Sequence, residues 1–200
     1  MLTLSLLRSA SGLASRPYRT PIATMTSRRL LATGQDQEPK EPPTVHFDAE
    51  ISKIYSIVAE NHRHPDGPWV KMLDKIHQYS ETTGRSNFAV LDLATGPGEP
   101  AETIARQFPD CTVVATDISP DQVAIATAKA ITLPHMTCQG ADMQDLATFT
   151  DNSFDLVTCC YGFMFPSDIP KAVQESYCVL KPGGQLIATT WNEIAVMADG

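Results

Sequence analysis

Residues 88–100 join a continuous apolar segment to a glycine turn, after which a helical pattern begins. An apolar run such as 88–93 is typical of a strand that is buried on both faces of a sheet. Gly96 and Gly98 permit a tight turn and let a ligand approach the backbone closely, because no Cβ stands in the way. The first N–H groups of the following helix favour a bound anionic group, such as a carboxylate. The sequence therefore predicts a strand–turn–helix unit with a ligand at the turn.

Apolar strand patterns alternate with amphipathic helical patterns along most of the chain. Strands are expected at 88–93, 111–116, 135–139, 154–160 and 185–190, and helices at 47–58, 69–79, 100–108, from 119 and at 169–180. Strands that are buried on both faces and separated by helices indicate a parallel sheet with helices on both sides. We therefore expect an α/β fold of the doubly wound, Rossmann-like kind, with a mostly parallel sheet.

An acidic residue, Asp117, ends the second expected strand. It is placed to accept hydrogen bonds from both hydroxyls of an adenosine ribose. Its alternative role is that of an Asp that merely flanks the helix beginning at Ser119. Several adenosine cofactors share this ribose, and residues 96–101 also satisfy the GxGxxA form of the dinucleotide fingerprint. These residues alone leave the kind of cofactor open.

Segments around the later strands indicate which kind of cofactor is bound. Asp142 and Met143 follow the third expected strand, residues 154–157 read FDLV, and residues 180–186 read LKPGGQL. Together with the two features above, they resemble the class I S-adenosylmethionine-dependent methyltransferases, notably the branch that contains the ubiquinone and menaquinone biosynthesis methyltransferases. The resemblance covers about residues 45–191. It implies S-adenosylmethionine as the cofactor and methyl transfer to a small-molecule acceptor, which the sequence does not identify.

The resemblance also implies roles for individual residues. By position, the cofactor-binding residues would be Asp92, Ala94, Gly96, Gly98, Asp117, Ile118, Asp142, Met143, Cys160 and Tyr161. Asp92 and the glycines would frame the methionine part of the cofactor, and Asp117 would hold the ribose. Asp142 would accept a hydrogen bond from the adenine amino group, and Cys160 and Tyr161 would border the sulfonium. Ala94 replaces the family's first glycine, which costs little if its φ is negative. The alternatives are a surface acid for Asp142 and an ordinary core residue for Tyr161.

A proton acceptor is needed only if the methyl acceptor carries an acidic proton, since methyl transfer depends mainly on alignment of the two reactants. The candidates are Tyr161, His62 and His64. The two histidines lie in a Pro- and Gly-rich break, and we expect solvated loop residues there and no metal. The odd number of cysteines and the lack of a CxxC spacing argue against disulfides and zinc, so we expect buried thiols at Cys111, Cys138, Cys159, Cys160 and Cys178.

Two alternative functions remain at this stage. The GxGxxA match at 96–101 supports an NAD(P)-dependent oxidoreductase, although Asp142 and the LKPGG segment argue against it. The other alternative is a non-catalytic subunit that binds a cofactor or a partner. It arises because only five strands are expected within 45–200, so that the family's C-terminal strands would be missing and 185–190 would form an open edge.

Residues 1–35 differ in composition from the rest of the chain. They contain five arginines and no acidic residue, whereas all 23 acidic residues follow. This composition is typical of a transit peptide, and we expect a mitochondrial location, with plastid or, from a start at Met25, cytoplasm as alternatives. A disordered tail is the other interpretation. We expect a short helix with Leu2, Leu6, Leu7 and Leu13 on one face, a Pro-rich linker at 36–44 and the methyltransferase domain at 45–200.

Charge and hydropathy restrict the partners. Beyond residue 35 the chain has 23 acidic residues and most of them are not offset by its basic ones, so a phosphate backbone would be repelled and nucleic acid is not expected as a substrate. No apolar run approaches the roughly 18 residues of a membrane-spanning helix. The oligomeric state is not fixed by the sequence.

Overall fold

The computed structural model describes residues 2–7, 50, 57, 62 and 64–190. The elements in chain order are β1 (Leu2–Leu7), α2 (Pro68–Thr83), β2 (Ala89–Leu93), α3 (Ala101–Gln107), β3 (Thr112–Asp117), α4 (Pro120–Ala130), β4 (Met136–Gly140), β5 (Phe154–Cys160), α5 (Ile169–Val179) and β6 (Leu180–Thr190). Of the helix expected at 47–58, residues 50 and 57 are described, and both are helical. The linker at 36–44, most of 1–35 and residues 191–200 lie outside the described residues.

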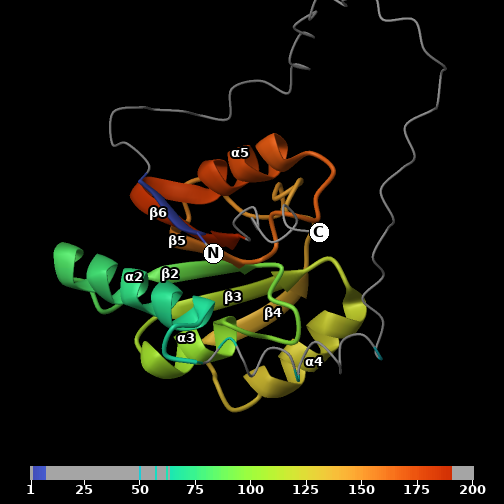
Figure 1. Cartoon of the computed structure of the whole chain (residues 1–200), viewed down its shortest axis with the longest axis horizontal. Helices are drawn as coiled ribbons and strands as arrows, with labels where there is room; N and C mark the ends of the chain where they lie inside the picture. Colours follow the sequence, from blue (N-terminus) through green and yellow to red (C-terminus); the bar gives the residue numbers. More distant parts are fainter. Residues whose placement is uncertain (1, 8–49, 51–56, 58–61, 63, 191–200) are drawn as a thin grey trace, which may run out of the picture.

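The strands form one sheet in the order β1-β6-β5-β2-β3-β4. All neighbouring pairs from β6 to β4 are parallel, and β1 alone runs antiparallel to its neighbour β6. Helices α3 and α4 cover one face of the sheet and α5 covers the other (Figure 1). The prediction of a doubly wound α/β fold is therefore confirmed. No helix among the described residues is long and apolar enough to cross a membrane.

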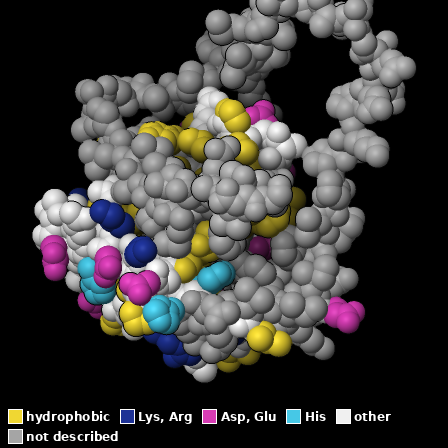
Figure 2. Space-filling model, viewed as in Figure 1, with side chains coloured by type: hydrophobic (Ala, Val, Ile, Leu, Met, Phe, Trp, Pro, Cys, Tyr) yellow, Lys and Arg dark blue, Asp and Glu magenta, His cyan; other side chains and the backbone are white. Residues whose placement is uncertain are grey.

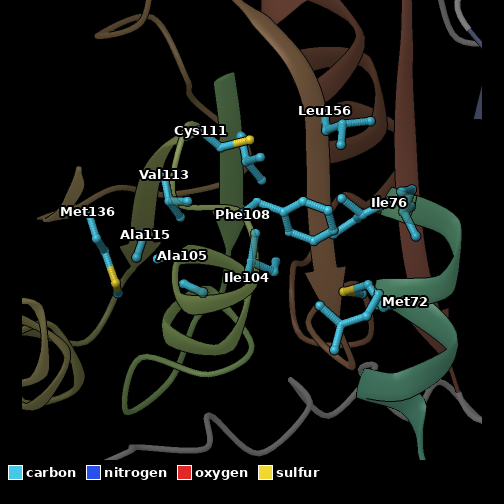
Figure 3. Close-up of a cluster of buried hydrophobic side chains, with 14 of the residues drawn as sticks. Met72, Ile76, Ile104, Ala105, Phe108, Cys111, Val113, Ala115, Met136 and Leu156 are labelled. Carbon is cyan, nitrogen blue, oxygen red and sulfur yellow. The ribbon is translucent and has the colours of Figure 1, made fainter. Parts of the chain in front are cut away.

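The two faces of the sheet explain why its strands are apolar throughout. Alternate residues of β2 enter different cores: Val90 packs with α2 and α3, whereas Leu91 packs on the α5 side. Every residue of β5 is buried, as a central strand of a doubly wound sheet requires. In the first core, Met72 and Ile76 of α2 lie across from residues of α3 and its end (Figure 3).

The N-terminal residues contradict the sequence-based expectation. Leu2–Leu7 forms the strand β1 and not a helix, with Leu2 opposite Thr190 and Leu7 opposite Gln185. The segment reads LTLSLL, so apolar and hydroxyl residues alternate with the period of a strand. β1 also covers β6, and the open edge expected at 185–190 is therefore absent among the described strands.

The LKPGG segment is an irregular part of β6 and not a separate turn. The register of β6 against β5 shifts between Phe154 and Leu156, and Gly183 has a φ of 82°. Lys181 donates to Asp155 Oδ2 at 2.6 Å, and Arg85 donates to the other oxygen at 3.1 Å. Asp155 is buried at the amino end of β5, so the FD and LKPGG patterns stabilise the sheet at the end away from the glycine turn.

Charges are mixed on the face shown in Figure 2. Lys and Arg side chains there alternate with Asp, Glu and His, and the described part of this face has no continuous basic patch. A basic groove for a phosphate backbone is thus not visible on that side of the described chain.

Candidate functional site

The order of the strands places the site. After β2 the chain continues to β3 on one side, and it later returns to β5 on the other side of β2. In sheets of this kind, ligands bind outside the carboxyl ends of the strands where the direction of winding changes. The residues that follow β2 and β5 meet at this switch point, because a Cβ added to Gly162 would lie 2.7 Å from the Cβ of Ala94.

The glycine turn is held by its own backbone and by the neighbouring strand. The Thr95 N–H donates to the Thr116 carbonyl at 2.8 Å, and the Gly98 N–H donates to the Thr95 carbonyl at 3.1 Å. Gly96 and Gly98 have φ values of 57° and 96°, where other residues are strained. Gly98 also lies against α4, since an added Cβ would be 3.0 Å from the Ala126 Cα. The predicted need for glycine is confirmed at both positions.

Ala94 departs from the expectation of a negative φ. Its φ is 52°, so an alanine occupies the left-handed conformation at the family's first glycine position. For an L-residue with a Cβ, this conformation costs about 1–2 kcal/mol. The assumption that the alanine costs little was wrong, because the tight turn after β2 requires the left-handed conformation whichever residue is present.

We expect Ala94→Gly to raise the free energy of unfolding by about 0.5–1 kcal/mol, since relief of the strain exceeds the added entropy of a glycine in the unfolded chain. The control is Ala128→Gly in α4, an exposed helical alanine that should lose about 1 kcal/mol. Urea unfolding measures both variants. A loss of stability in Ala94→Gly comparable to that in Ala128→Gly would contradict the strain.

The start of α3 is occupied by a side chain of this protein. Glu99 is buried, and its Oε2 accepts hydrogen bonds from the Thr103 N–H at 3.2 Å and the Thr103 hydroxyl at 2.8 Å. A carboxylate from a ligand would meet this charge, so the anion site expected at the helix start is already filled. This is a correction to the sequence-based interpretation. The sequence feature that could have indicated this is the acidic residue directly after Gly98.

Asp92 is fully buried in the middle of the sheet. Its Oδ1 accepts a hydrogen bond from the Thr158 hydroxyl at 2.5 Å, and Thr158 is its direct register partner on β5. Its Oδ2 has no donor at hydrogen-bonding geometry within the described chain, although the nearby Thr95 hydroxyl group favours the charged form of the carboxyl group. Burial, with a smaller contribution from the charges of Glu99 and Asp117, raises the pKa of Asp92 to about 7. The hydroxyl groups of Thr158 and Thr95 lower this pKa in part. A cation bound at Oδ2 would offset the free-energy cost of the buried charge on Asp92.

Asp117 connects the end of β3 to the glycine turn. Its Oδ2 accepts from the Gly96 N–H at 2.8 Å, and its Oδ1 accepts from the Ser119 N–H at 2.9 Å. Burial raises the pKa of its carboxyl group. Since a carboxylate offers about four acceptor positions, both bonds leave room for a ligand hydroxyl. The expected position beside the turn is confirmed, and the ribose role stays a prediction.

The residues expected around an adenine ring lie at the same edge of the sheet. Ile118, directly after β3, is 70% exposed, which leaves an apolar surface for a ring to cover. The Met143 Cε reaches to within 3.3 Å of a Cβ placed on Gly162, so Met143 contacts the switch point. Asp142 accepts at Oδ1 from the Gln144 N–H at 2.8 Å. This bond organises the loop after β4, and the adenine role of Asp142 stays a prediction.

The structure separates the three candidate proton acceptors. The rings of His62 and Tyr161 are in contact, with centroids 5.3 Å apart. His64 is instead a surface residue with a side chain 68% exposed, and its Nδ1 accepts from the Asp66 N–H. Cys160 accepts at Sγ from the Thr189 hydroxyl, and burial raises its pKa to about 12, so it is a neutral thiol.

Sequence reasoning missed Thr95, Glu99 and Thr158. A signal existed for Thr158, because a polar residue at the centre of a buried strand needs a partner, and Asp92 is the polar residue of the adjacent strand. The prediction of buried thiols holds for Cys111, Cys159 and Cys160, but Cys138 and Cys178 are only half-buried, because they lie nearer the surface of the sheet and of α5. Within the described residues, no three metal-ligating side chains gather.

The chemistry of these residues can be tested against the two cofactor types. Asp92, Glu99 and Asp117 are three buried carboxyl groups around one turn. The ammonium and sulfonium groups of S-adenosylmethionine are cations that such a cluster attracts, whereas the pyrophosphate of NAD would be repelled. The unbonded Oδ2 of Asp92 also fits a cationic donor. The residues present fit S-adenosylmethionine, and the oxidoreductase alternative is not favoured.

Comparisons with known proteins agree with this geometry. Residues 90–184 match the family model described as a methyltransferase domain. The demethylmenaquinone methyltransferase of Thermus thermophilus is 38% identical over 104 residues, which are 49% of this chain and 44% of that protein. The demethylmenaquinone methyltransferase of Symbiobacterium thermophilum is 30% identical over 157 residues, 74% of this chain and 61% of that protein.

A solved structure supports the fold alone. It is that of a putative S-adenosylmethionine-dependent methyltransferase from Methanococcus maripaludis, which matches with a TM-score of 0.60 and 22% identity over 78% of this chain and 68% of that one. The chain spans about half of the length of the curated relatives it matches. Residues 90–184 therefore match a methyltransferase domain and have the fold of the S-adenosylmethionine-dependent methyltransferases, and the chain is similar to quinone-biosynthesis C-methyltransferases over part of their length.

Proposed function

We propose that this protein transfers the methyl group of S-adenosylmethionine to a small-molecule acceptor. The observation that carries the proposal is the buried, half-unbonded carboxyl group of Asp92 at the switch point between β2 and β5. A buried charge of this kind is costly in the protein alone and becomes favourable when a cation is bound.

In this proposal each residue binds one part of the cofactor. Asp92 accepts from the ammonium group of the methionine part, and Asp117 accepts from the ribose hydroxyls while it holds Gly96. Asp142 accepts from the adenine amino group, with Ile118 beside the ring. The bound cofactor supplies the methyl group, and the protein contributes orientation and exclusion of water. Alignment of the two reactants can lower the barrier by several kcal/mol, roughly 7–11 in the best cases.

We further propose that the acceptor is a hydroxylated aromatic ring of the kind that becomes a quinone. The printed names of two relatives, both demethylmenaquinone methyltransferases, support this class. The loop that follows Tyr161 and the first residue of α5 add a physical argument, since Met164 and Phe165 in the loop and Ile169 in the helix are exposed apolar side chains. An apolar acceptor would cover part of this surface.

The cofactor is tested by calorimetry with S-adenosylhomocysteine and with NADH. We expect S-adenosylhomocysteine to bind and NADH to show no binding, because three buried carboxyl groups surround the turn where a pyrophosphate would lie. Transfer of label from methyl-labelled S-adenosylmethionine to a reduced, short-chain demethylmenaquinone then tests the activity. Tighter binding of NADH than of S-adenosylhomocysteine would overturn the proposal.

For location, we propose import into mitochondria through residues 1–35, on the basis of their five arginines and lack of acidic residues. A fluorescent protein fused after residue 35 should colocalise with a mitochondrial dye. Replacement of the five arginines by glutamine is the control and should abolish the localisation. A diffuse or secreted signal from the unmodified fusion would show that the segment does not direct import.

A further inference from the structure

We infer that His62 takes the proton that the methylated ring loses and that Tyr161 positions the ring by a hydrogen bond to its oxygen. This inference rests on the proposed methyl transfer and adds the residues that handle the proton. It starts from a contact between two residues that are distant in the sequence and that meet beside the switch point.

The position of the pair follows from β5. Tyr161 directly follows β5, next to Gly162, where an added Cβ would lie 2.7 Å from the Cβ of Ala94 in the glycine turn. The His62 ring lies against Tyr161 on one side, with centroids 5.3 Å apart, and against Trp69 of α2 on another, with centroids 5.6 Å apart. The imidazole is thus held between two elements at the edge where the cofactor and the acceptor must meet.

The backbone of Tyr161 is held in an unusual conformation. Its φ is 56°, which is rare for a bulky residue, and such outliers cluster at functional sites. The Tyr161 N–H donates to the Thr189 carbonyl at 3.1 Å and to the Thr189 hydroxyl at 3.2 Å, and these bonds to β6 maintain the conformation. The sheet therefore fixes the direction in which the tyrosine leaves β5.

The surroundings of the pair set its protonation. Burial lowers the pKa of His62. Among the described residues, the rings that lie against it are those of Tyr161, directly after β5, and Trp69 of α2. Burial raises the pKa of Tyr161 and raises that of Cys160 to about 12. At neutral pH the imidazole is therefore neutral and can accept a proton, while the phenol keeps its proton and can donate a hydrogen bond.

The chemistry of a hydroxylated ring requires this proton transfer. The ring carbon next to the hydroxyl forms the new carbon–carbon bond as the methyl–sulfur bond breaks, and the electron pair of that bond stays on the sulfur. The ring then loses the hydrogen of the methylated carbon as a proton and regains its aromatic character. His62 takes this proton and later passes it to water, and the Tyr161 hydroxyl donates a hydrogen bond to the ring oxygen.

The kinetic test compares His62→Gln with His64→Gln, a matched change at an exposed histidine two residues away. With a reduced short-chain demethylmenaquinone, His62→Gln should lower kcat about 100-fold or more near pH 7, and His64→Gln should leave it unchanged. Both variants should bind S-adenosylhomocysteine as the wild type does. The wild-type rate should fall on acidification with an apparent pKa below 6.5, and this acidic limb should be absent in His62→Gln.

Tyr161→Phe separates positioning from proton acceptance. It should keep the acidic limb of the pH profile and lose about tenfold in rate, because one hydrogen bond to the acceptor is missing. Equal rates for His62→Gln and His64→Gln in an active enzyme would overturn the inference and leave the proposed function intact. So would an acidic limb that survives in His62→Gln.

A measurement without turnover tests the pair separately from the reaction. In the wild type, the imidazole Cε1–H signal of His62, assigned by its absence in His62→Gln, should titrate below the ordinary histidine pKa of 6.5. It should also shift when S-adenosylhomocysteine is added. An enzyme that binds the cofactor and transfers no methyl group would contradict the proposed function. A His62 signal that titrates at pH 6.5 or above and does not shift on addition of S-adenosylhomocysteine would overturn the inference.

Discussion

Asp92→Asn is expected to stabilise the cofactor-free protein at alkaline pH and to weaken S-adenosylhomocysteine binding by about 100-fold. The carboxyl group is fully buried, its Oδ2 has no hydrogen bond within the described chain, and its pKa is raised from 3.8 to about 7. Asn keeps the Oδ1 that accepts from Thr158 and carries no charge. It therefore removes the cost of a buried charge together with the acceptor for a cationic ammonium group.

The pH dependence of the stability follows from the direction of this shift. Between the unfolded pKa of 3.8 and the folded pKa of about 7, the folded protein holds a proton that the unfolded chain has released. The stability contributed by this proton is complete below the window and is lost as the pH rises through it, by as much as about 2–4 kcal/mol. Asp92→Asn should lack this loss.

Thermal unfolding of the wild type and Asp92→Asn at about pH 5 and pH 8 measures the effect. The Tm of Asp92→Asn relative to that of the wild type should be higher at pH 8 than at pH 5, by roughly 5 °C or more. Asp74→Asn, a change at an exposed carboxyl group on α2, is the control and should follow the wild type at both. A difference between wild type and Asp92→Asn that does not change with pH would show that the pKa of the Asp92 carboxyl group in the folded protein does not lie between these two pH values. Unchanged affinity for S-adenosylhomocysteine would separate Asp92 from the cofactor.

Asp117→Ala is expected to weaken S-adenosylhomocysteine binding by about 100-fold or more, and Asp142→Ala by about tenfold. Asp117 holds the Gly96 and Ser119 N–H groups, so its removal loosens the turn as well as the ribose contact. Each hydrogen bond to a charged group contributes about 1.5–3 kcal/mol. Asp142 is only partly buried, and its hydrogen bonds are local ones to Gln144. Its replacement should therefore remove less of the binding free energy.

Asp117→Asn refines the test, because an amide has one acceptor oxygen and can satisfy only one of the two N–H groups. Its loss of affinity should lie between those of the wild type and Asp117→Ala when all are measured by calorimetry. Circular dichroism confirms that each variant remains folded. Equal affinity of the wild type and Asp117→Ala would show that this carboxylate does not face the ribose. A larger loss in Asp142→Ala would reverse the expected order of the two residues.

The parallel part of the sheet could be predicted because its signals are local. The apolar runs of β2, β3 and β5 and the helical patterns between them depend only on neighbouring residues, and burial on both faces leaves a parallel arrangement as the solution. The same holds for the glycines at 96 and 98 and for Asp117, which must lie at the carboxyl end of β3 once that strand forms.

Other features depend on residues that meet only in three dimensions. The pairing of β1 with β6 joins the first described residues to the last, and the alternation in LTLSLL is too short to distinguish a strand from a helix that could serve import. The left-handed φ of Ala94 follows from the path of the turn between β2 and α3, and the residue type gives no sign of it. The contact between His62 and Tyr161, like the pKa of Asp92, depends on burial by elements far apart in the chain. The sequence predicted a cofactor role for Asp92, Ala94 and Tyr161. Packing determined which residues face one another and which are charged, because burial and long-range contact are properties of the folded chain.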